Sequence, residues 1–436
     1  MNIVNKIPAL LISIIIIMSF LFTSKVMTSE KIGTLFSLSK DVMFLFICLV
    51  AFIIFLKSFK LRVNALNLLI IIYLLILLFY AAISPLGNIA FKGALQMIYA
   101  PLLFLLLQYF YIPPKRFEKV LRYCYYFFLL LIVSSLIIYW LIGQNLFYDL
   151  IGLKQYYIQM GNENMIYGLT RFTNTGAMKY RLTGLLISPV EMSVVSMFTI
   201  IISMFFVANK KIRLLIISLS FLTLFMSGGR SIIVGIFFAF WTKKILEMPV
   251  LLRSLAIVAT IGISVLIISF VISNDALWKA YLDPSAAIHL YDLFIKGPEE
   301  ALRNWQGIGI GMSGMLGTQL SAQQLTIERI HIESEYLMMI VQIGVFGFLI
   351  YFFIICAVIK KLFLIKRSSL CSAQMLKKTD AAIMIVLSVH YSALTIASLS
   401  SRLIVTFMWL FVFLVINEYQ FAKKVNRIEC SVGNNV

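Results

Sequence analysis

The chain has 436 residues, of which 61% are hydrophobic and only 13% are charged, and its formal net charge is +19. The mean hydropathy of +0.99 is too high for a soluble protein, because a core of this length cannot enclose so much apolar surface. The composition therefore predicts an all-α integral membrane protein and excludes a soluble enzyme or a nucleic-acid-binding domain.

Twelve apolar segments are candidates to cross a bilayer, where a helical span takes about 20 apolar residues. The run 212–242 is interrupted at MSGGRS, so we interpret it as two short helices that meet at a turn. We expect a single polytopic domain over residues 1–436. The predicted spans are 7–23, 41–56, 63–83, 91–111, 124–142, 184–207, 212–226, 230–242, 251–273, 336–358, 381–399 and 403–421.

Basic residues are concentrated in short loops that would share one side of the membrane, such as 57–62, 115–122, 210–213 and 360–378. Cytoplasmic loops of membrane proteins carry an excess of Lys and Arg, so this pattern predicts that both termini are cytoplasmic. The positive charge thus reports topology, and no nucleic-acid partner is expected because no soluble domain presents a basic face.

Two predicted outer segments, 143–183 and 274–335, are too long to be simple connectors. The first is rich in tyrosine and asparagine, and the second contains Trp278 and Trp305. We expect both to contain short helices lying along the membrane surface. Their aromatic side chains fit either an interfacial belt or stacking against sugar rings.

Three arginines from distant parts of the chain are predicted to share the outer face at similar depth. Arg181 precedes a span, Arg230 lies at the MSGGRS break, and Arg402 lies in SLSSRL at the mouth of the last hairpin. Clustered guanidinium groups can hold a diphosphate and stabilise its charge as a leaving group without a metal. The alternative is that they extend to lipid headgroups.

Glu191 follows in RLTGLLISPVEMS. If residues 181–191 form one helix, Glu191 lies about 15 Å beyond Arg181, and Pro189 would bend that helix. A carboxylate so deep is costly unless it is paired or faces a cavity, so Glu191 is a candidate supporting residue. A structural ion pair between two helices is the alternative.

The stretch IERIHIESEY, residues 327–336, crowds ionisable side chains against an uncharged span. On a helix His331 and Glu335 would share a face, whereas Glu333 would point elsewhere. Each could act as a general base on a sugar hydroxyl, and a solvated charge cluster is the alternative. No metal site is expected, because further ligands are lacking, and no cofactor is expected.

The preceding GIGIGMSG, residues 307–314, is not interpreted as a dinucleotide fingerprint, because it follows no strand and opens no βαβ unit. We expect a flexible or tightly turning segment that leads to the site.

Four segments resemble, in order and spacing, the O-antigen polymerase and O-antigen ligase superfamily of bacterial GT-C-type membrane glycosyltransferases. They are RLTGLLISPVE, LFMSGGRS, GIGIGMS and HIESEYLMMIVQIGVFGFL, all within residues 181–353. The resemblance implies a GT-C-like fold in the bacterial inner membrane with periplasmic outer loops. It also implies glycan transfer from undecaprenyl diphosphate, with Arg181 and Arg230 holding the diphosphate.

The family's histidine usually stands in an H-N-x-Y-L pattern before a G-x-x-G span. Counting back from Gly344 and Gly347 puts this position on Glu333, with His331 two residues earlier. The base therefore stays open among His331, Glu333 and Glu335. The departure favours a polymerase over a ligase.

The resulting hypothesis is inverting, metal-independent polymerisation of undecaprenyl-diphosphate-linked oligosaccharide repeat units into O-antigen or capsule-type polysaccharide. The lipid-linked oligosaccharide would be both donor and acceptor, and a chain-length regulator and a flippase would be candidate partners. One alternative is an O-antigen ligase that transfers glycan to lipid A-core. An alternative of another class is a lipid-linked oligosaccharide flippase or other multi-span transporter.

Overall fold

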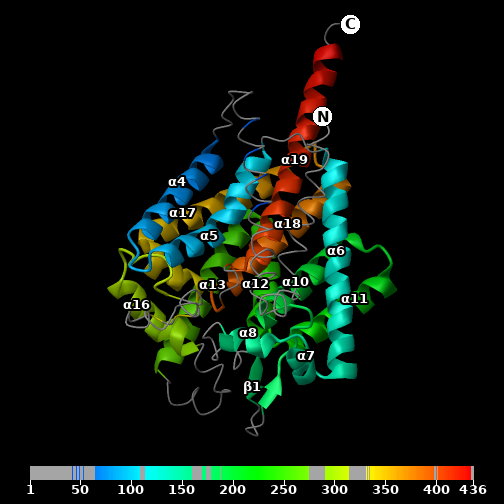
Figure 1. The fold of residues 1–436 in the computed structure, drawn as a ribbon. Helices are drawn as coiled ribbons and strands as arrows, with labels where there is room; N and C mark the ends of the chain where they lie inside the picture. Colours follow the sequence, from blue (N-terminus) through cyan, green and yellow to red (C-terminus); the bar gives the residue numbers. More distant parts are fainter. Residues whose placement is uncertain are drawn as a thin grey trace.

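The computed structural model describes residues 64–108, 113–159, 169–172, 178–186, 188–273, 290–313, 334–396 and 401–433, and single positions at 42, 46, 49, 53, 330, 332 and 399. Figure 1 shows a bundle of helices with one small β-hairpin. The helices and strands are α4 (Ala65–Ala82), α5 (Asn88–Leu107), α6 (Pro114–Ile137), the π-helical turn η1 (Ile138–Ile142), α7 (Gln144–Leu150), α8 (Leu153–Gln159), β1 (Thr170–Phe172), β2 (Met178–Tyr180), α10 (Pro189–Phe206), α11 (Lys210–Met226), α12 (Arg230–Glu247), α13 (Val250–Ser273), η2 (Asp292–Lys296), α16 (Gly297–Arg303), α17 (Glu335–Lys366), α18 (Ala373–Ser392) and α19 (Arg402–Gly433).

The predicted spans from 63–83 onward each coincide with a helix. Within the described ranges, six helical segments are long and apolar enough to cross a membrane: Ala65–Ala82, Asn88–Leu107, Pro114–Ile142, Pro189–Phe206, Glu335–Lys366 and Leu403–Asn426. The protein is therefore a helical membrane protein, as its composition predicts. The predicted spans 7–23 and 41–56 fall outside the described residues, apart from four isolated positions in the second.

The break predicted at MSGGRS is present between α11 and α12. Helix α11 ends at Met226 with Ser227 as its C-cap, Gly228 has a φ of 76°, and α12 begins at Arg230. A positive φ is readily adopted only by glycine, so Gly228 allows the chain to reverse here. The prediction of two short helices in place of one long helix is confirmed.

The first long outer segment contains the expected short helices, α7 and α8, together with the hairpin β1–β2, which the sequence analysis did not predict. The two strands pair antiparallel, with Thr170 opposite Tyr180. These elements lie at the opposite end of the molecule from the C-terminal end of α19 (Figure 1). The second long segment contributes α16.

Helix α19 is the centre of the core, and 78% of its most apolar stretch is buried. Phe407 lies 4.8 Å, centroid to centroid, from both Phe128 of α6 and Phe198 of α10. Trp409 of the same helix packs 5.0 Å from Phe104 of α5. Dispersion among these large side chains holds four helices together, since hydrocarbon outside the bundle gives little hydrophobic drive for association.

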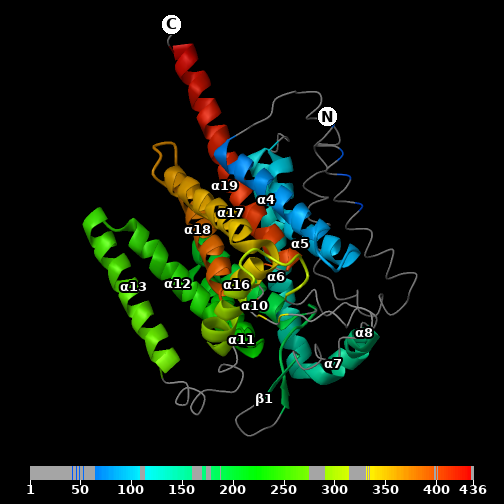
Figure 2. The same ribbon diagram turned by 90° about the vertical axis from the view of Figure 1, so that its left-hand side faces the viewer.

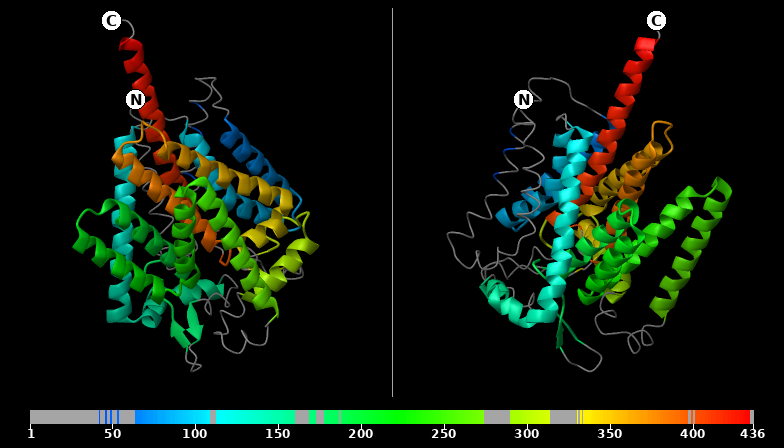
Figure 3. Two further views of the ribbon diagram at one scale, coloured as in Figure 1. Left: turned by 180° about the vertical axis from the view of Figure 1, so that it is seen from behind. Right: turned by 90° about the vertical axis from the view of Figure 1, so that its right-hand side faces the viewer.

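At the other extreme, α13 lies at the margin of the bundle, where Figures 2 and 3 show it packed beside α12 and apart from α19. Its side chains are largely exposed and apolar, among them Leu251, Val258, Leu266 and Phe270. Such a surface suits contact with lipid chains.

Ion pairs join the helices near the end from which α19 projects. Lys378 of α18 is only 3% exposed, and its Nζ lies 3.1 Å from Glu118 Oε2 of α6 and 2.9 Å from Glu418 Oε2 of α19. A second group links α12, α17 and α18. Its members are Lys243, Glu247, Lys366 and Asp380. The predicted inside ends of these helices therefore share one layer.

Helix α17 is interrupted at Gly344, which has non-helical φ and ψ of 71° and 168°. The glycine-rich segment fills this gap: the Ile308 N–H donates to Val341 O at 2.9 Å, and the Gly309 N–H donates to Gln342 O at 3.1 Å. The Ile310 N–H donates to Tyr80 O of α4. The segment is thus the tightly turning element that we expected, and it satisfies backbone groups that the interruption releases.

Candidate functional site

Arg181 lies against the turn between α11 and α12. Its Nε donates a hydrogen bond of 2.9 Å to the Ser227 carbonyl oxygen, and its backbone N–H donates to Leu169 O. A Cβ atom on Gly228 would lie only 2.9 Å from Arg181 Nε, so the side chain passes directly over this glycine. Two residues further along, Arg230 begins α12 and is exposed.

The backbone of Arg181 is held from the other side by Tyr148 of α7, whose hydroxyl donates 2.6 Å to the Arg181 carbonyl oxygen. Tyr148 is fully buried, and burial raises the pKa of its phenol. The hydroxyl therefore remains protonated and keeps its role as a donor. The first outer segment thus fixes the position of Arg181.

The start of α10 completes this neighbourhood. The hydroxyl groups of Ser193 and Ser227 are 2.6 Å apart, and the Ser401 hydroxyl donates 2.8 Å to Glu191 Oε1. Arg402, the next residue after Ser401, is the first residue of α19. Segments carrying Arg181, Arg230 and Arg402 therefore converge at one end of the bundle. Because α12 and α19 both begin here, their dipoles add positive potential.

The helical spacing predicted between Arg181 and Glu191 is wrong. Residues 181–188 are not helical, Ser188 caps α10 by accepting from the Val190 N–H at 3.2 Å, and Pro189 is the first helical residue. Proline is well suited to a first helical position, because its missing N–H would have no partner there. Glu191 therefore lies in the first turn at the helix end, and Pro189 starts the helix rather than bending it.

Among the three candidate bases, His331 and Glu333 lie outside the described residues. Their neighbours are anchored: the Ile330 N–H donates to Met312 O, and Ile332 is buried. Glu335 is 1% exposed, and its backbone N–H donates 3.0 Å to Ala393 O. The expectation that one helix carries both His331 and Glu335 is wrong, because Ser334 is extended and α17 begins only at Glu335.

Helices α12 and α18 run antiparallel, so the start of α12, which carries Arg230, and the end of α18, which contacts the start of α17, lie at the same end of the bundle. Gly235, near the start of α12, faces Ser392 at the end of α18. Lys243, near the end of α12, pairs with Asp380 in the first half of α18. Arg230 precedes Gly235 by about 7.5 Å along the helix. It therefore lies beyond the level of Ser392, at the end of the bundle where α18 ends and Ala393 O accepts from the Glu335 N–H at the start of α17.

His390 of α18 is a further buried residue near the site that was not predicted from the sequence. It is 7% exposed, and neither ring nitrogen has a hydrogen-bond partner within the described part of the chain. Its ring lies 5.8 Å from that of Tyr351 and 6.4 Å from that of Tyr336, both of α17. A histidine inside an otherwise uncharged apolar segment was the signal in the sequence.

Comparison with protein-family models gives no match, and comparison with curated protein sequences gives no significant match either.

Proposed function

We propose that the chain is a membrane glycosyltransferase that polymerises undecaprenyl-diphosphate-linked oligosaccharides into O-antigen or capsule-type polysaccharide. The observation that carries the proposal is the convergence of Arg181, the Ser227 turn with Arg230, and the start of α19 at Arg402. A diphosphate is the ligand that several guanidinium groups and helix N-termini favour most. The four-segment resemblance to the O-antigen superfamily supports the same chemistry.

In the proposed mechanism Arg181 and Arg230, with Arg402, stabilise the charge that develops on the diphosphate as the glycosidic bond breaks. A base takes the proton of the acceptor hydroxyl, and the transfer inverts the anomeric centre. Burial of Glu335 keeps its carboxylate away from an acceptor in the described arrangement, which favours His331 or Glu333 as the base. Glu191 then has a supporting role, in which it joins α10 to the start of α19 through Ser401.

The proposal includes the location of the protein. The resemblance to the O-antigen superfamily implies the bacterial inner membrane, and the basic loops favour cytoplasmic termini, with the arginines facing the periplasm. Donor and acceptor would both be lipid-linked oligosaccharides, and a chain-length regulator and a flippase would be partners. The polymerase is favoured over a ligase to lipid A-core by the irregular histidine motif.

A transporter is the second candidate, because α17 is discontinuous at Gly344 and broken helices form ion sites in many carriers. In this chain, however, Val341 O and Gln342 O at the break accept from the N–H groups of Ile308 and Gly309. The carbonyl groups that would bind an ion are therefore already engaged, which weighs against transport.

The test is incubation of the purified protein with a lipid-linked repeat unit in detergent, where a polymerase yields a ladder of products. Arg230→Ala should abolish the ladder and leave the protein folded in the membrane. Arg303→Ala is the matched control, since the Arg303 side chain is 66% exposed and its ion pairs among the described residues are surface pairs with Glu299 and Glu300. A wild-type ladder from Arg230→Ala would refute the assigned role. A ligase would form product only when lipid A-core is added, and a transporter would form none.

A further inference from the structure

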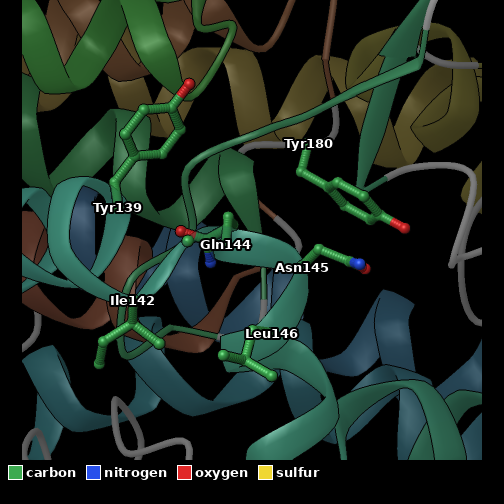
Figure 4. A pocket seen from close by; sticks show the side chains of 7 residues that line it. Tyr139, Ile142, Gln144, Asn145, Leu146 and Tyr180 are labelled. Atoms are coloured by element: carbon green, nitrogen blue, oxygen red, sulfur yellow. The ribbon is translucent and has the colours of Figure 1, made fainter.

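A hollow of about 520 Å³ opens between η1, the start of α7 and the end of β2. Its size lies within the range of about 300–1,000 Å³ that is typical of small-molecule sites. Figure 4 shows the rings of Tyr139 and Tyr180 on either side, with the side chains of Gln144 and Asn145 between them. None of these residues belongs to the arginine site described above.

Gln144 is the most informative residue of the hollow. Its side chain is 4% exposed, and its Nε2 donates 3.3 Å to Thr183 Oγ1. Its Oε1 is buried and has no hydrogen-bond partner within the described part of the chain. A buried acceptor without a donor is unfavourable, so a ligand that brings a hydroxyl or N–H group to this oxygen would bind well.

The charges beside the hollow are balanced, which weighs against an anion. Lys154 Nζ lies 2.8 Å from Asp149 Oδ1, donates 2.6 Å to Asn145 Oδ1, and lies 5.5 Å from the centroid of the Tyr180 ring. An acyl chain fits poorly as well, because the polar side chains of Gln144 and Asn145 line the hollow between the two tyrosines. The ligand should therefore be neutral, rich in hydroxyl groups and partly apolar.

We infer that the hollow is a saccharide-binding subsite. A sugar ring presents an apolar C–H face to an aromatic side chain, and its hydroxyl groups both donate and accept, as primary amides do. Tyr180 is followed directly by Arg181, and Thr183 holds Gln144. A glycan in the hollow would therefore lie beside the proposed diphosphate site. The choice of a bacterial oligosaccharide as the ligand rests on the proposed function, whereas the saccharide chemistry rests on the hollow alone.

The test is binding of the purified full chain to a printed array of bacterial O-antigen and capsule oligosaccharides. The detergent must be zwitterionic, because a maltoside headgroup would compete. We expect the wild-type protein to bind at least one oligosaccharide on the array. Tyr180→Ala and Tyr139→Ala should weaken this binding on the order of tenfold, whereas Tyr180→Phe should retain it, because stacking needs the ring and not the hydroxyl.

Thermal unfolding of each variant identifies any loss of binding that comes from misfolding, and Leu146→Ala, in the same hollow but away from both rings, provides a further comparison. Absence of binding by the wild-type protein, or unchanged binding by folded Tyr139→Ala and Tyr180→Ala, would overturn the inference. The product ladder is scored separately. Sugar binding without a ladder would refute the proposed polymerase and leave the subsite intact. A product ladder together with unchanged sugar binding by both tyrosine variants would support the polymerase and refute the subsite.

Discussion

Replacing Gly228 with alanine tests whether the turn between α11 and α12 positions Arg181. Gly228 has a φ of 76°, where an L-residue is strained by about 1–2 kcal/mol. The new Cβ would also lie 2.9 Å from Arg181 Nε and would displace the guanidinium group from the Ser227 carbonyl. A hydrogen bond to a charged group contributes about 1.5–3 kcal/mol. Since a small shift weakens this bond without removing it, we expect the free energy of unfolding to fall by about 2–3 kcal/mol.

Two measurements separate strain from function. Unfolding in mixed micelles of detergent and dodecyl sulfate gives the loss of stability, and the product ladder gives the loss of activity. Gly87→Ala is the control for backbone strain, because Gly87 has a φ of 53° but nothing lies within 4 Å of an added Cβ. It should lose stability and keep activity. Gly262→Ala, in the helical α13 with open space around it, should be neutral or stabilising by up to about 1 kcal/mol.

Gly228 does not position Arg181 if Gly228→Ala forms a wild-type ladder and unfolds no more readily than Gly262→Ala. A second outcome is that activity survives while stability falls as it does in Gly87→Ala. In that case the turn would support the fold, and the side chain of Arg181 would tolerate displacement without loss of transfer.

Three further substitutions test other parts of the structure. Lys378→Met should cost about 3–5 kcal/mol in unfolding free energy, because it leaves the Glu118 and Glu418 carboxylates facing each other inside the bundle. His390→Phe should keep or raise stability, because it removes two buried nitrogens that have no partner among the residues that the structure describes. A concurrent loss of the product ladder would therefore mark His390 as functional. Gly344→Ala should speed amide hydrogen exchange in residues 307–313, because its Cβ would lie 2.5 Å from Gln306 O and push the glycine-rich segment away.

Each of these has an outcome that would contradict it. Arg303→Met is the control for Lys378→Met, because the Arg303 side chain is 66% exposed, and it should change the free energy of unfolding by no more than about 1 kcal/mol. An equal loss of stability in the two variants would show that burial does not strengthen the ion pairs of Lys378. A clear loss of stability in His390→Phe would indicate that the ring nitrogens have partners in solution. Unchanged exchange in Gly344→Ala would mean that the segment does not depend on the break.

The sequence predicted the helices well because a helix that crosses a bilayer needs a long, continuous run of apolar residues, and such runs are easy to recognise. It also located the MSGGRS turn, because paired glycines interrupt such a run. It did not reveal that α10 starts at Pro189, since proline is compatible both with a first helical position and with a kink. The break in α17 was hidden as well, because Gly344 is non-helical only through its contact with a segment that is distant in sequence.

For the candidate site, one prediction was that the segments carrying Arg181, Arg230 and Arg402 share one end of the bundle, as they do. A second prediction was that one helix carries both His331 and Glu335, and it is wrong because α17 begins at Glu335. The first prediction depended only on which loop lies on which side, and that is a matter of topology. The second depended on where a helix starts, and that depends on the bond from the Glu335 N–H to Ala393 O. The hairpin β1–β2 and the hollow beside Tyr180 depend on pairing between short segments, for which local sequence carries little signal.

The distribution of fixed contacts bears on the choice between an enzyme and a carrier. The glycine-rich segment joins α4 to α17 through the Ile310 N–H to Tyr80 O and through Ser84 Oγ, which donates 2.9 Å to Ile310 O. Near the opposite end, Lys378 joins α6, α18 and α19. Rocking of one half against the other would have to break these bonds in every cycle. Glycosyl transfer needs only that two lipid-linked substrates reach a preorganised site, so a bundle tied at both ends suits a transferase better than a carrier.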